Sequence, residues 1–180
     1  MLVRCALGPD EVTLVPGNHD LYTSPMAWLD ALDGPLRAWS RNAAREQGKV
    51  VDLGETIILP IDATFHQPVT RSAGRLDEAV EEAVAARLAD PRFASRHVIV
   101  AIHHPPHPRP GPWHWVDGLL GGKRLLAMIA GRPNVIVAHG HLHRHEVRDH
   151  AGASVIGAAA VVDGAHALFI GERRELFASA

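Results

Sequence analysis

The 180-residue sequence contains one cysteine, few aromatic residues and no long hydrophobic run. With Cys5 alone, the chain forms no internal disulfide and no thiolate cluster for structural zinc. A membrane-spanning helix needs about 18 consecutive apolar residues, which the sequence does not offer. Charged residues, Gly and Pro interrupt residues 1–15, unlike a secretory signal. We therefore expect one globular domain over residues 1–180, in the cytoplasm and with no membrane partner.

The charge is also unremarkable, with 18 basic and 20 acidic residues and a net charge of -2. The two signs are interspersed, so no basic patch indicates a specific nucleic-acid partner. Histidine is the abundant residue: the 13 histidines outnumber the 4 Phe, 4 Trp and 1 Tyr combined. Many of them fall between His97 and His141. This composition indicates metal or phosphate chemistry with nitrogen and oxygen ligands.

Hydrophobic spacing predicts an α/β domain in which strands and helices alternate. Helices are expected over residues 25–44, as two short pieces broken at Gly34–Pro35, and over residues 76–89 and 119–130. Strands are expected over residues 12–15, 50–53, 56–64, 98–102 and 135–138, and around 146–148, 154–156 and 165–170. Gly54–Glu55 forms the turn of a hairpin between the second and third strands.

Three of these strands end in polar clusters, Asn18-His19-Asp20, His103-His104 and His141-Leu142-His143. Loops beyond the carboxyl ends of strands converge in open α/β sheets, so the three clusters are expected to meet. On an extended chain, His141 and His143 would share a face and approach one centre. Imidazoles and an amide oxygen suit zinc, iron, manganese or nickel.

Each cluster has a plainer interpretation when taken alone. The first also fits an ordinary turn with a solvated histidine, and His103-His104-Pro105-Pro106 fits a strand end followed by a surface loop. All three in this order favour a common metal site. Trp113, His114 and Trp115 fit either a lid that stacks on a base or a loop packed onto the domain.

The order Gly17-Asn18-His19-Asp20, His103-x-Pro105 and Gly140-His141-x-His143 resembles motifs three to five of calcineurin-like metallophosphoesterases. The resemblance covers essentially the whole chain. It implies a sandwich of two mixed β-sheets flanked by helices, with a two-metal site at one end. The His-His-Pro-Pro segment looks most like the cyclic-nucleotide phosphodiesterase branch. The implied substrate is a small phosphate ester, which includes nucleotides as a class.

The same resemblance implies a role for each matching residue. Asn18, His103 and His141 would bind one metal, and His143 would bind the other. His19 would contact the scissile phosphate and help the leaving oxygen depart. His104, His139 and Asp20 would contact these ligands or the substrate and would not bind metal. A metal-activated hydroxide would attack the phosphorus.

The family begins with Asp-x-His and Gly-Asp-x-x-Asp motifs, and neither occurs in these 180 residues. We therefore expect a domain incomplete at its N-terminus, without its first strands. Two divalent ions about 3.5 to 4 Å apart repel by roughly 17 to 19 kcal/mol at an effective dielectric near 20. The remaining ligands are neutral, so at most one ion is expected. Asp62 and Asp20 are candidate substitutes, but each is expected to cap a turn or pair with a base.

Three hypotheses follow for the function of the chain. The first is a metal-dependent phosphoesterase that is incomplete as written. The second is a catalytically inactive remnant that binds metal or a partner, and the third is a histidine-rich domain without metal. An unpaired apolar strand at residues 12–15 would also invite self-association.

Overall fold

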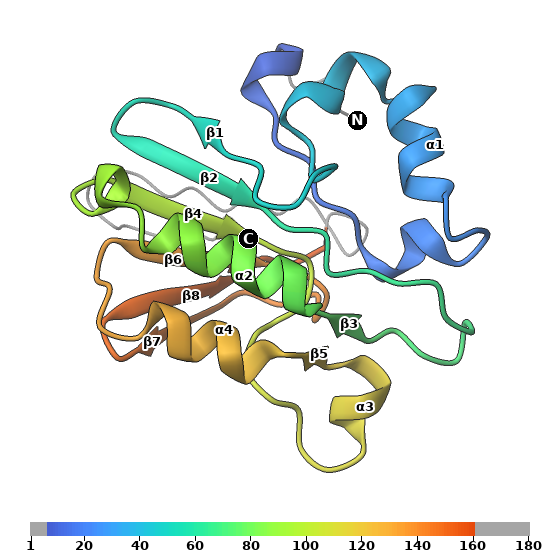
Figure 1. Ribbon diagram of the computed structural model, residues 1–180. Coiled ribbons are helices and arrows are strands. Elements are labelled where there is room, and N and C mark those ends of the chain that lie inside the picture. Colours follow the sequence, from blue (N-terminus) through green and yellow to red (C-terminus); the bar gives the residue numbers. More distant parts are fainter. Residues whose placement is uncertain (1–6, 161–180) are drawn as a thin grey trace.

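The computed structural model describes residues 7–160 and shows an α/β fold around a six-stranded mixed sheet (Figure 1). In spatial order its strands are β1 (Val51–Asp52), β2 (Thr56–Pro60), β4 (His97–Ala101), β6 (Val135–His139), β8 (Ala153–Gly157) and β7 (Glu146–His150). Strands β2, β4, β6 and β8 are parallel, while β1 and β7 pair antiparallel at the two edges. A small second sheet pairs β3 (Gly74–Arg75) with β5 (Leu119–Leu120). The expected α/β class with two sheets is confirmed.

The carboxyl ends of the central strands are aligned with one another. Val100 pairs with Leu59 on one side and with Val137 on the other. The ladder continues past the strands, because the N–H of Ile102 donates to the carbonyl of Ala138 at 3.0 Å. The loops that follow β4 and β6 therefore leave the sheet next to each other. Figure 1 shows β3, β5 and α3 (Trp113–Asp117) on this side of the sheet.

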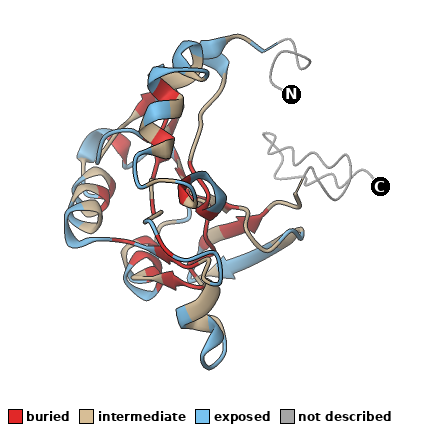
Figure 2. Cartoon of the chain, turned by 90° about the vertical axis from the view of Figure 1, so that its right-hand side faces the viewer, coloured by how far each residue is buried: buried red, intermediate tan, exposed pale blue. Residues whose placement is uncertain are grey.

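Helices α2 (Glu78–Leu88) and α4 (Gly122–Ile129) lie side by side over one face of the sheet (Figure 1). The strands present alternate residues to these helices, as extended chain requires. The main core, seen as the buried centre of Figure 2, is apolar on both sides of this contact. From the strands it includes Ile57, Leu59, Val98, Val100, Val135, Val137 and Val155, and from the helices Val84, Leu88, Leu125, Leu126 and Ile129.

The N-terminal part packs around a smaller core of its own. It contains the 3₁₀ helices η2 (Pro9–Glu11), η3 (Asn18–Leu21) and η4 (Arg37–Asn42), and the helix α1 (Ala27–Asp33). Its buried residues are Leu21, Trp28, Leu32 and Ala43. The Trp28 indole N–H donates to the carbonyl of Ala44 at 2.7 Å, which satisfies its buried polar atom. The expected break at Gly34–Pro35 is confirmed, although the second piece is a 3₁₀ helix.

The predicted strand at residues 12–15 is wrong as regular structure. These residues are half-buried and belong to no strand among the residues the structure describes. The carbonyl of Leu14 accepts from the N–H of Ala44 at 2.8 Å, so the segment is tied to the chain that follows η4. A β-branched run favours extended backbone, but a strand also needs a partner to complete its hydrogen bonds.

The helix predicted over residues 119–130 begins later than expected, at Gly122. Leu119 and Leu120 pair with β3, and Gly121 then turns the chain with a left-handed φ of 92°. Apolar residues at 119 and 120 fit a buried strand as well as a helix, which explains the error. The helix at 76–89, the hairpin at Gly54–Glu55 and the strands at 98–102, 135–138, 146–148 and 154–156 are confirmed within one or two residues. The strand at 165–170 lies outside the described residues.

The short 3₁₀ helix η5 (Pro91–Phe93) connects α2 to β4. It explains why α2 stops where the sequence predicted, since a proline cannot continue the preceding helix. Among residues 7–160, no helix has the length and apolar character needed to cross a membrane.

Replacing Leu32 by alanine tests whether the smaller core folds together with the sheet. Leu32 is fully buried, whereas Met26, just before α1, is 49% exposed. We expect Leu32→Ala to lower the free energy of unfolding by about 2 to 5 kcal/mol and Met26→Ala to change it by at most about 0.5 kcal/mol. Urea denaturation followed by circular dichroism measures both. A single transition with an unchanged slope is expected, and two separate transitions in the variant would contradict one cooperative unit.

Candidate metal centre

Asn18 is held in a tight loop by its neighbours. The Asp20 carboxylate accepts from the N–H of Gly17 at 2.7 Å, and the N–H of Asp20 donates to the Gly17 carbonyl at 3.1 Å. Asp20 therefore caps this loop, as expected from the sequence. The side chain of Asn18 is only 3% exposed. Its amide donates to the Tyr22 hydroxyl at 2.7 Å, which turns the Asn18 Oδ1 atom in the opposite direction, toward His103.

The loop after β4 carries two histidines of the site, and the first of them contacts Asn18. His103 is partly buried and His104 is fully buried. Gly17 lies directly against the first ring, since a Cβ atom at Gly17 would be 2.8 Å from His103 Cε1. The absence of a side chain at position 17 is thus required for the approach of His103 to Asn18.

The loop after β6 delivers His141 with a left-handed backbone. The N–H of Gly140 donates to the His103 carbonyl at 3.1 Å, and the N–H of Leu142 donates back to the Gly140 carbonyl at 2.7 Å. His141 and His143 have φ values of 66° and 53°. The expectation that these two residues share a face of extended chain is therefore wrong. Left-handed backbone at residues other than glycine is strained and gathers at functional sites.

Four of the predicted residues lie close together. His103 Nε2 lies 3.0 Å from Asn18 Oδ1 and 3.3 Å from His141 Nδ1. In addition, His103, His104 and His141 each offer one nitrogen within a group whose atoms all lie within 4.8 Å. The ring centroids of His104 and His141 are 4.5 Å apart. The structure thus brings Asn18, His103, His104 and His141 together.

Backbone carbonyls determine which ring nitrogens carry protons. His141 Nε2 lies 3.1 Å from the Asp117 carbonyl oxygen, and His104 Nε2 lies 2.8 Å from that of Ser72. A carbonyl oxygen only accepts, so each Nε2 must donate. In a neutral ring, the proton on Nε2 leaves Nδ1 with a lone pair. The lone pair of His141 Nδ1 consequently faces His103 Nε2.

His104 shows the same tautomer in a more enclosed setting. Its Nδ1 atom is buried and has no hydrogen-bond partner among the described residues. Gly74 lies against the ring, because a Cβ atom there would be 2.4 Å from this nitrogen. A buried hydrogen-bond acceptor without a partner is costly. The lone pair on His104 Nδ1 is therefore left unused by the hydrogen bonds of the described residues.

The surroundings keep these histidines neutral. Burial lowers the pKa of His103 to about 3, and repulsion from a protonated His141 adds to the effect. Burial also lowers the pKa of His104 to about 3, again with a contribution from His141. The pKa of His141 is lowered by burial, although its bond to the Asp117 backbone opposes the shift. Neutral imidazole is the form that binds metals.

The donor set fits a divalent cation. Ligands that each sit about 2.0 to 2.1 Å from a tetrahedral metal are separated by roughly 3.3 to 3.4 Å, close to the 3.3 Å between His141 Nδ1 and His103 Nε2. The bond from His141 to a backbone carbonyl is the arrangement that usually orients a metal-binding histidine. Within the described residues, however, the group contains only histidines and no carboxylate.

The other predicted residues lie around this group. His19 and His143 are exposed, and both lie near enough for their charge to lower the pKa of His103. The His19 ring is 5.0 Å from that of Tyr22. His139 is 5% exposed and turns toward β7, where its Nε2 lies 3.4 Å from Glu146 Oε1. Burial lowers the pKa of His139.

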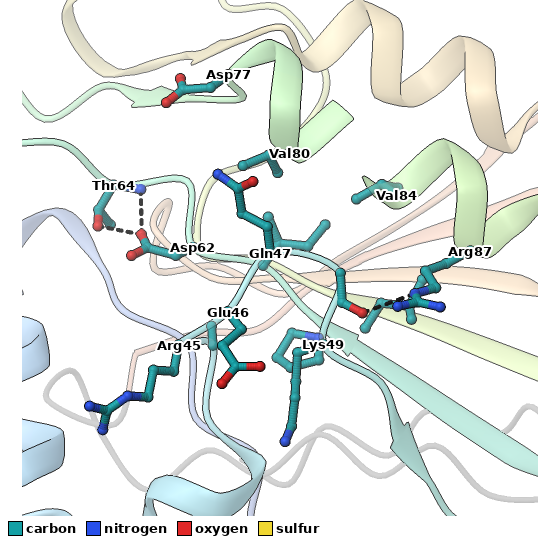
Figure 3. A pocket seen from close by; sticks show the side chains of 15 residues that line it. Arg45, Glu46, Gln47, Lys49, Asp62, Thr64, Asp77, Val80, Val84 and Arg87 are labelled. Carbon is teal, nitrogen blue, oxygen red and sulfur yellow. Dashed lines mark hydrogen bonds between the residues drawn. The ribbon is translucent and has the colours of Figure 1, made fainter. Parts of the chain in front are cut away.

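The acidic substitute considered from the sequence, Asp62, caps a turn. Its Oδ1 accepts from the backbone N–H and the hydroxyl of Thr64 at 2.8 and 2.5 Å, and burial raises its pKa. Asp62 instead lines a pocket of about 210 Å³ between the end of β2, α2 and residues 44–49 (Figure 3). None of the clustered histidines lines this pocket. Two of its basic residues are already engaged, Arg45 by Asp33 and Arg87 by the Gly48 carbonyl.

Comparison with protein families identifies residues 2–145 as a calcineurin-like phosphoesterase domain. The chain belongs to the calcineurin-like phosphoesterase family. This match spans most of the sequence and includes Asn18, His103 and His141. No curated protein matches the chain. Membership in a metal-dependent family of calcineurin-like phosphoesterases agrees with the histidine group, and it supports hydrolase and metal-binding functions.

Several contributors to this calcineurin-like phosphoesterase centre were not predicted. The carbonyls of Ser72 and Asp117 carry no sequence signal, because every residue has one. Tyr22 follows Asn18 by four positions, a spacing that places side chains together on a helical turn and is a usable signal. Gly74 gave no sign of its contact with His104.

The pH dependence of the free energy of unfolding tests whether the buried histidines are neutral. Both His103 and His104 have a folded-state pKa of about 3 against the ordinary 6.5, so below pH 6.5 the unfolded chain binds more protons. Stability of the metal-free protein should therefore be fully present above pH 6.5 and fall toward pH 3. The slope should approach about 1.4 kcal/mol per pH unit for each histidine. Urea unfolding in EDTA at pH 7.5, 6 and 5 measures it. An unchanged stability over this range would contradict the assignment, and His104→Gln should reduce the slope.

Adding a methyl group at Gly17 tests the packing that positions His103. Gly17 has a φ of -106°, so alanine fits the backbone, and the added Cβ disturbs only the close approach of His103. We expect Gly17→Ala to weaken zinc binding about 10- to 100-fold, measured by competition with a chromophoric chelator. Gly140→Ala is the control, since a Cβ atom there would meet only His103 Nδ1, at an ordinary 3.9 Å. Equal losses in both variants would show that the approach of Gly17 to His103 is not the cause.

Proposed function

We propose that this chain hydrolyses phosphate esters with the help of a divalent cation held by Asn18, His103 and His141. The observation that carries the proposal is the convergence of two atoms on His103 Nε2: the Asn18 amide oxygen lies 3.0 Å from it and His141 Nδ1 lies 3.3 Å from it. Iron, manganese, zinc and nickel all suit these donors. Family membership supports the reaction class, and the neutral state of the histidines supports binding at pH 7.

The side chains around the donors would keep them in place. Tyr22 holds the amide of Asn18, and the Asp117 carbonyl holds the ring of His141. When bound, the cation supplies Lewis acidity toward the phosphoryl oxygen and a lower pKa for water. His103 would carry its proton on Nδ1, because Nε2 then serves as the donor to the cation. His104, wedged against Gly74, would form the buried wall behind the donors.

The exposed residues next to the centre would act on the substrate. His19 follows Asn18 directly in η3 and is exposed, so it can meet the phosphate and donate a proton to the leaving oxygen. His143 stands two residues after His141 in the same strained loop. We propose His143 as a ligand for a second cation, which would bind only if carboxylate ligands joined the histidines. His139 would stabilise the loop by donating from Nδ1 to the carbonyl of Gly140 at 3.1 Å.

A second candidate function is a metal-binding or partner-binding protein without catalysis. The specific observation in its favour is the composition of the group, which contains no carboxylate among residues 7–160. Neutral ligands do not offset the repulsion between two dications, so a single cation is expected. A single cation with three protein donors is still a familiar catalytic arrangement. Metal stoichiometry and turnover, measured together, separate the two candidates.

Metal titration and hydrolysis of bis-para-nitrophenyl phosphate test the proposal. We expect about one cation per chain and measurable turnover that EDTA abolishes. His141→Ala should abolish both, because it removes a donor. His104→Gln should weaken metal binding less, since His104 is not one of the three proposed ligands and only packs behind them. Metal binding without turnover would favour the second candidate, and no metal binding at all would contradict the proposed hydrolysis and the metal-binding form of the second candidate.

A further inference from the structure

A stack of alternating aromatic and cationic side chains lies beside the metal centre. The guanidinium carbon of Arg71 is 4.2 Å from the centroid of the Trp115 ring and 5.1 Å from that of Phe65. The guanidinium carbon of Arg75 lies 4.8 Å from the centroid of the same Phe65 ring. These three contacts link Trp115 to Arg71, Arg71 to Phe65 and Phe65 to Arg75, and the four side chains are called the stack. Cation–π attraction holds each pair together.

The two arginines of the stack differ in their charge partners. Arg75 donates from Nε to the carboxylate of Asp77 at 3.0 Å, so its charge is offset. Arg71 donates from Nε to the backbone carbonyl of Trp115 at 2.9 Å, and it pairs with no carboxylate among the described residues. Its positive charge is fixed in position by two aromatic rings and one hydrogen bond. Such a cation is prepared to meet an anion.

Trp115 offers an open aromatic surface on this stack. Its side chain lies on α3 and the residue is 61% exposed, although Arg71 covers part of it. A large exposed aromatic residue is uncommon, and base stacking on such a ring is tolerant of base identity. The combination of an exposed ring and an unpaired cation suits a ligand that carries both a planar aromatic group and a phosphate.

Hydrogen bonds connect the stack to the metal centre from two directions. The Tyr22 hydroxyl, which accepts from Asn18, donates to the carbonyl of Arg71 at 3.4 Å. Trp115 precedes by two residues the Asp117 carbonyl that orients His141. The N–H of Ser72 donates to the Val116 carbonyl at 2.8 Å, which joins the two segments. Arg71 is adjacent in sequence to Ser72, whose carbonyl orients His104, and Trp115 is two residues from Asp117, whose carbonyl orients His141.

We propose that Trp115 and Arg71 form the binding site for the nucleoside part of a nucleotide ester. The nucleobase stacks on the open face of Trp115, and Arg71 contacts an anionic oxygen of the same ligand. The ester phosphate then points toward Asn18 and His103. This inference rests on the proposed function for the orientation of the ligand, and it extends it by naming the substrate class.

The simpler role for these residues is to staple α3 to the segment around Arg71. A staple predicts that substitutions lower stability and leave ligand affinity unchanged. A nucleotide site predicts that they change affinity in a way that depends on the ligand. The chain supplies a matched control, because Trp113 lies on the same helix, is 57% exposed and forms no cation–π pair with Arg71 among the described residues.

Calorimetric titration of the full chain with three probes tests the proposal. The probes are adenosine 5′-monophosphate, ribose 5-phosphate, which lacks the base, and adenosine, which lacks the phosphate. In EDTA, the wild-type chain should bind the nucleotide about 5- to 100-fold more tightly than ribose 5-phosphate. Trp115→Ala should remove this difference, and Trp115→Phe should retain most of it. Trp113→Ala should change nothing. Arg71→Gln should weaken binding of the nucleotide but not of adenosine.

Equal affinity of the wild-type chain for the nucleotide and for ribose 5-phosphate would overturn the proposal. This result needs no variant, so it stands even if Trp115→Ala does not fold. Unchanged discrimination in a folded Trp115→Ala variant would overturn it as well. Because the titration is made without metal, it is independent of turnover. Hydrolysis without base discrimination would refute only the nucleotide site, whereas base discrimination without hydrolysis would refute only the proposed reaction.

Discussion

The structure of the candidate metal centre depends on two hydrogen-bond acceptors that are both held against one nitrogen, His103 Nε2. Asn18 Oδ1 and His141 Nδ1 both lie within 3.3 Å of His103 Nε2. A single proton on that nitrogen satisfies one of them well and leaves the other with a poor partner. Enclosing such a group costs free energy, which a bound cation would offset. The strained loop at His141 and the tight approach of Gly17 to His103 persist because the aligned sheet holds both loops in place.

The small sheet has a larger role than its four residues suggest. Strands β3 and β5 pair next to the carbonyls of Ser72 and Asp117, which fix the tautomers of His104 and His141. The same two segments carry Arg71 and Trp115. Ring orientation at the metal centre and the exposed stack therefore share one support. A rigid backbone platform of this kind restricts the donors more firmly than flexible side chains do.

The sequence predicted the elements whose apolar pattern is satisfied locally. The strands that end two residues before His103 and His141 are buried runs of the right length, and the helix at 76–89 has apolar residues at helical spacing. Convergence of their loops followed from the parallel sheet. The sequence failed where a distant partner decides the structure. Residues 12–15 have the composition of a strand but lack a strand partner among the described residues. Leu119 and Leu120 were predicted as helix but form a strand, because they pair with Gly74 and Arg75. The left-handed His141 was invisible because no local residue type signals it.

The tautomers of His104 and His141 are set by main-chain oxygens, and this has a consequence for anyone mapping the centre by mutagenesis. Exchanging the side chain at position 72 or 117 leaves the carbonyl where it was, so an alanine scan will pass over two of the atoms that matter most to ring orientation. Only chemistry that alters the peptide group itself, such as replacing the amide by an ester one residue later, would expose their contribution.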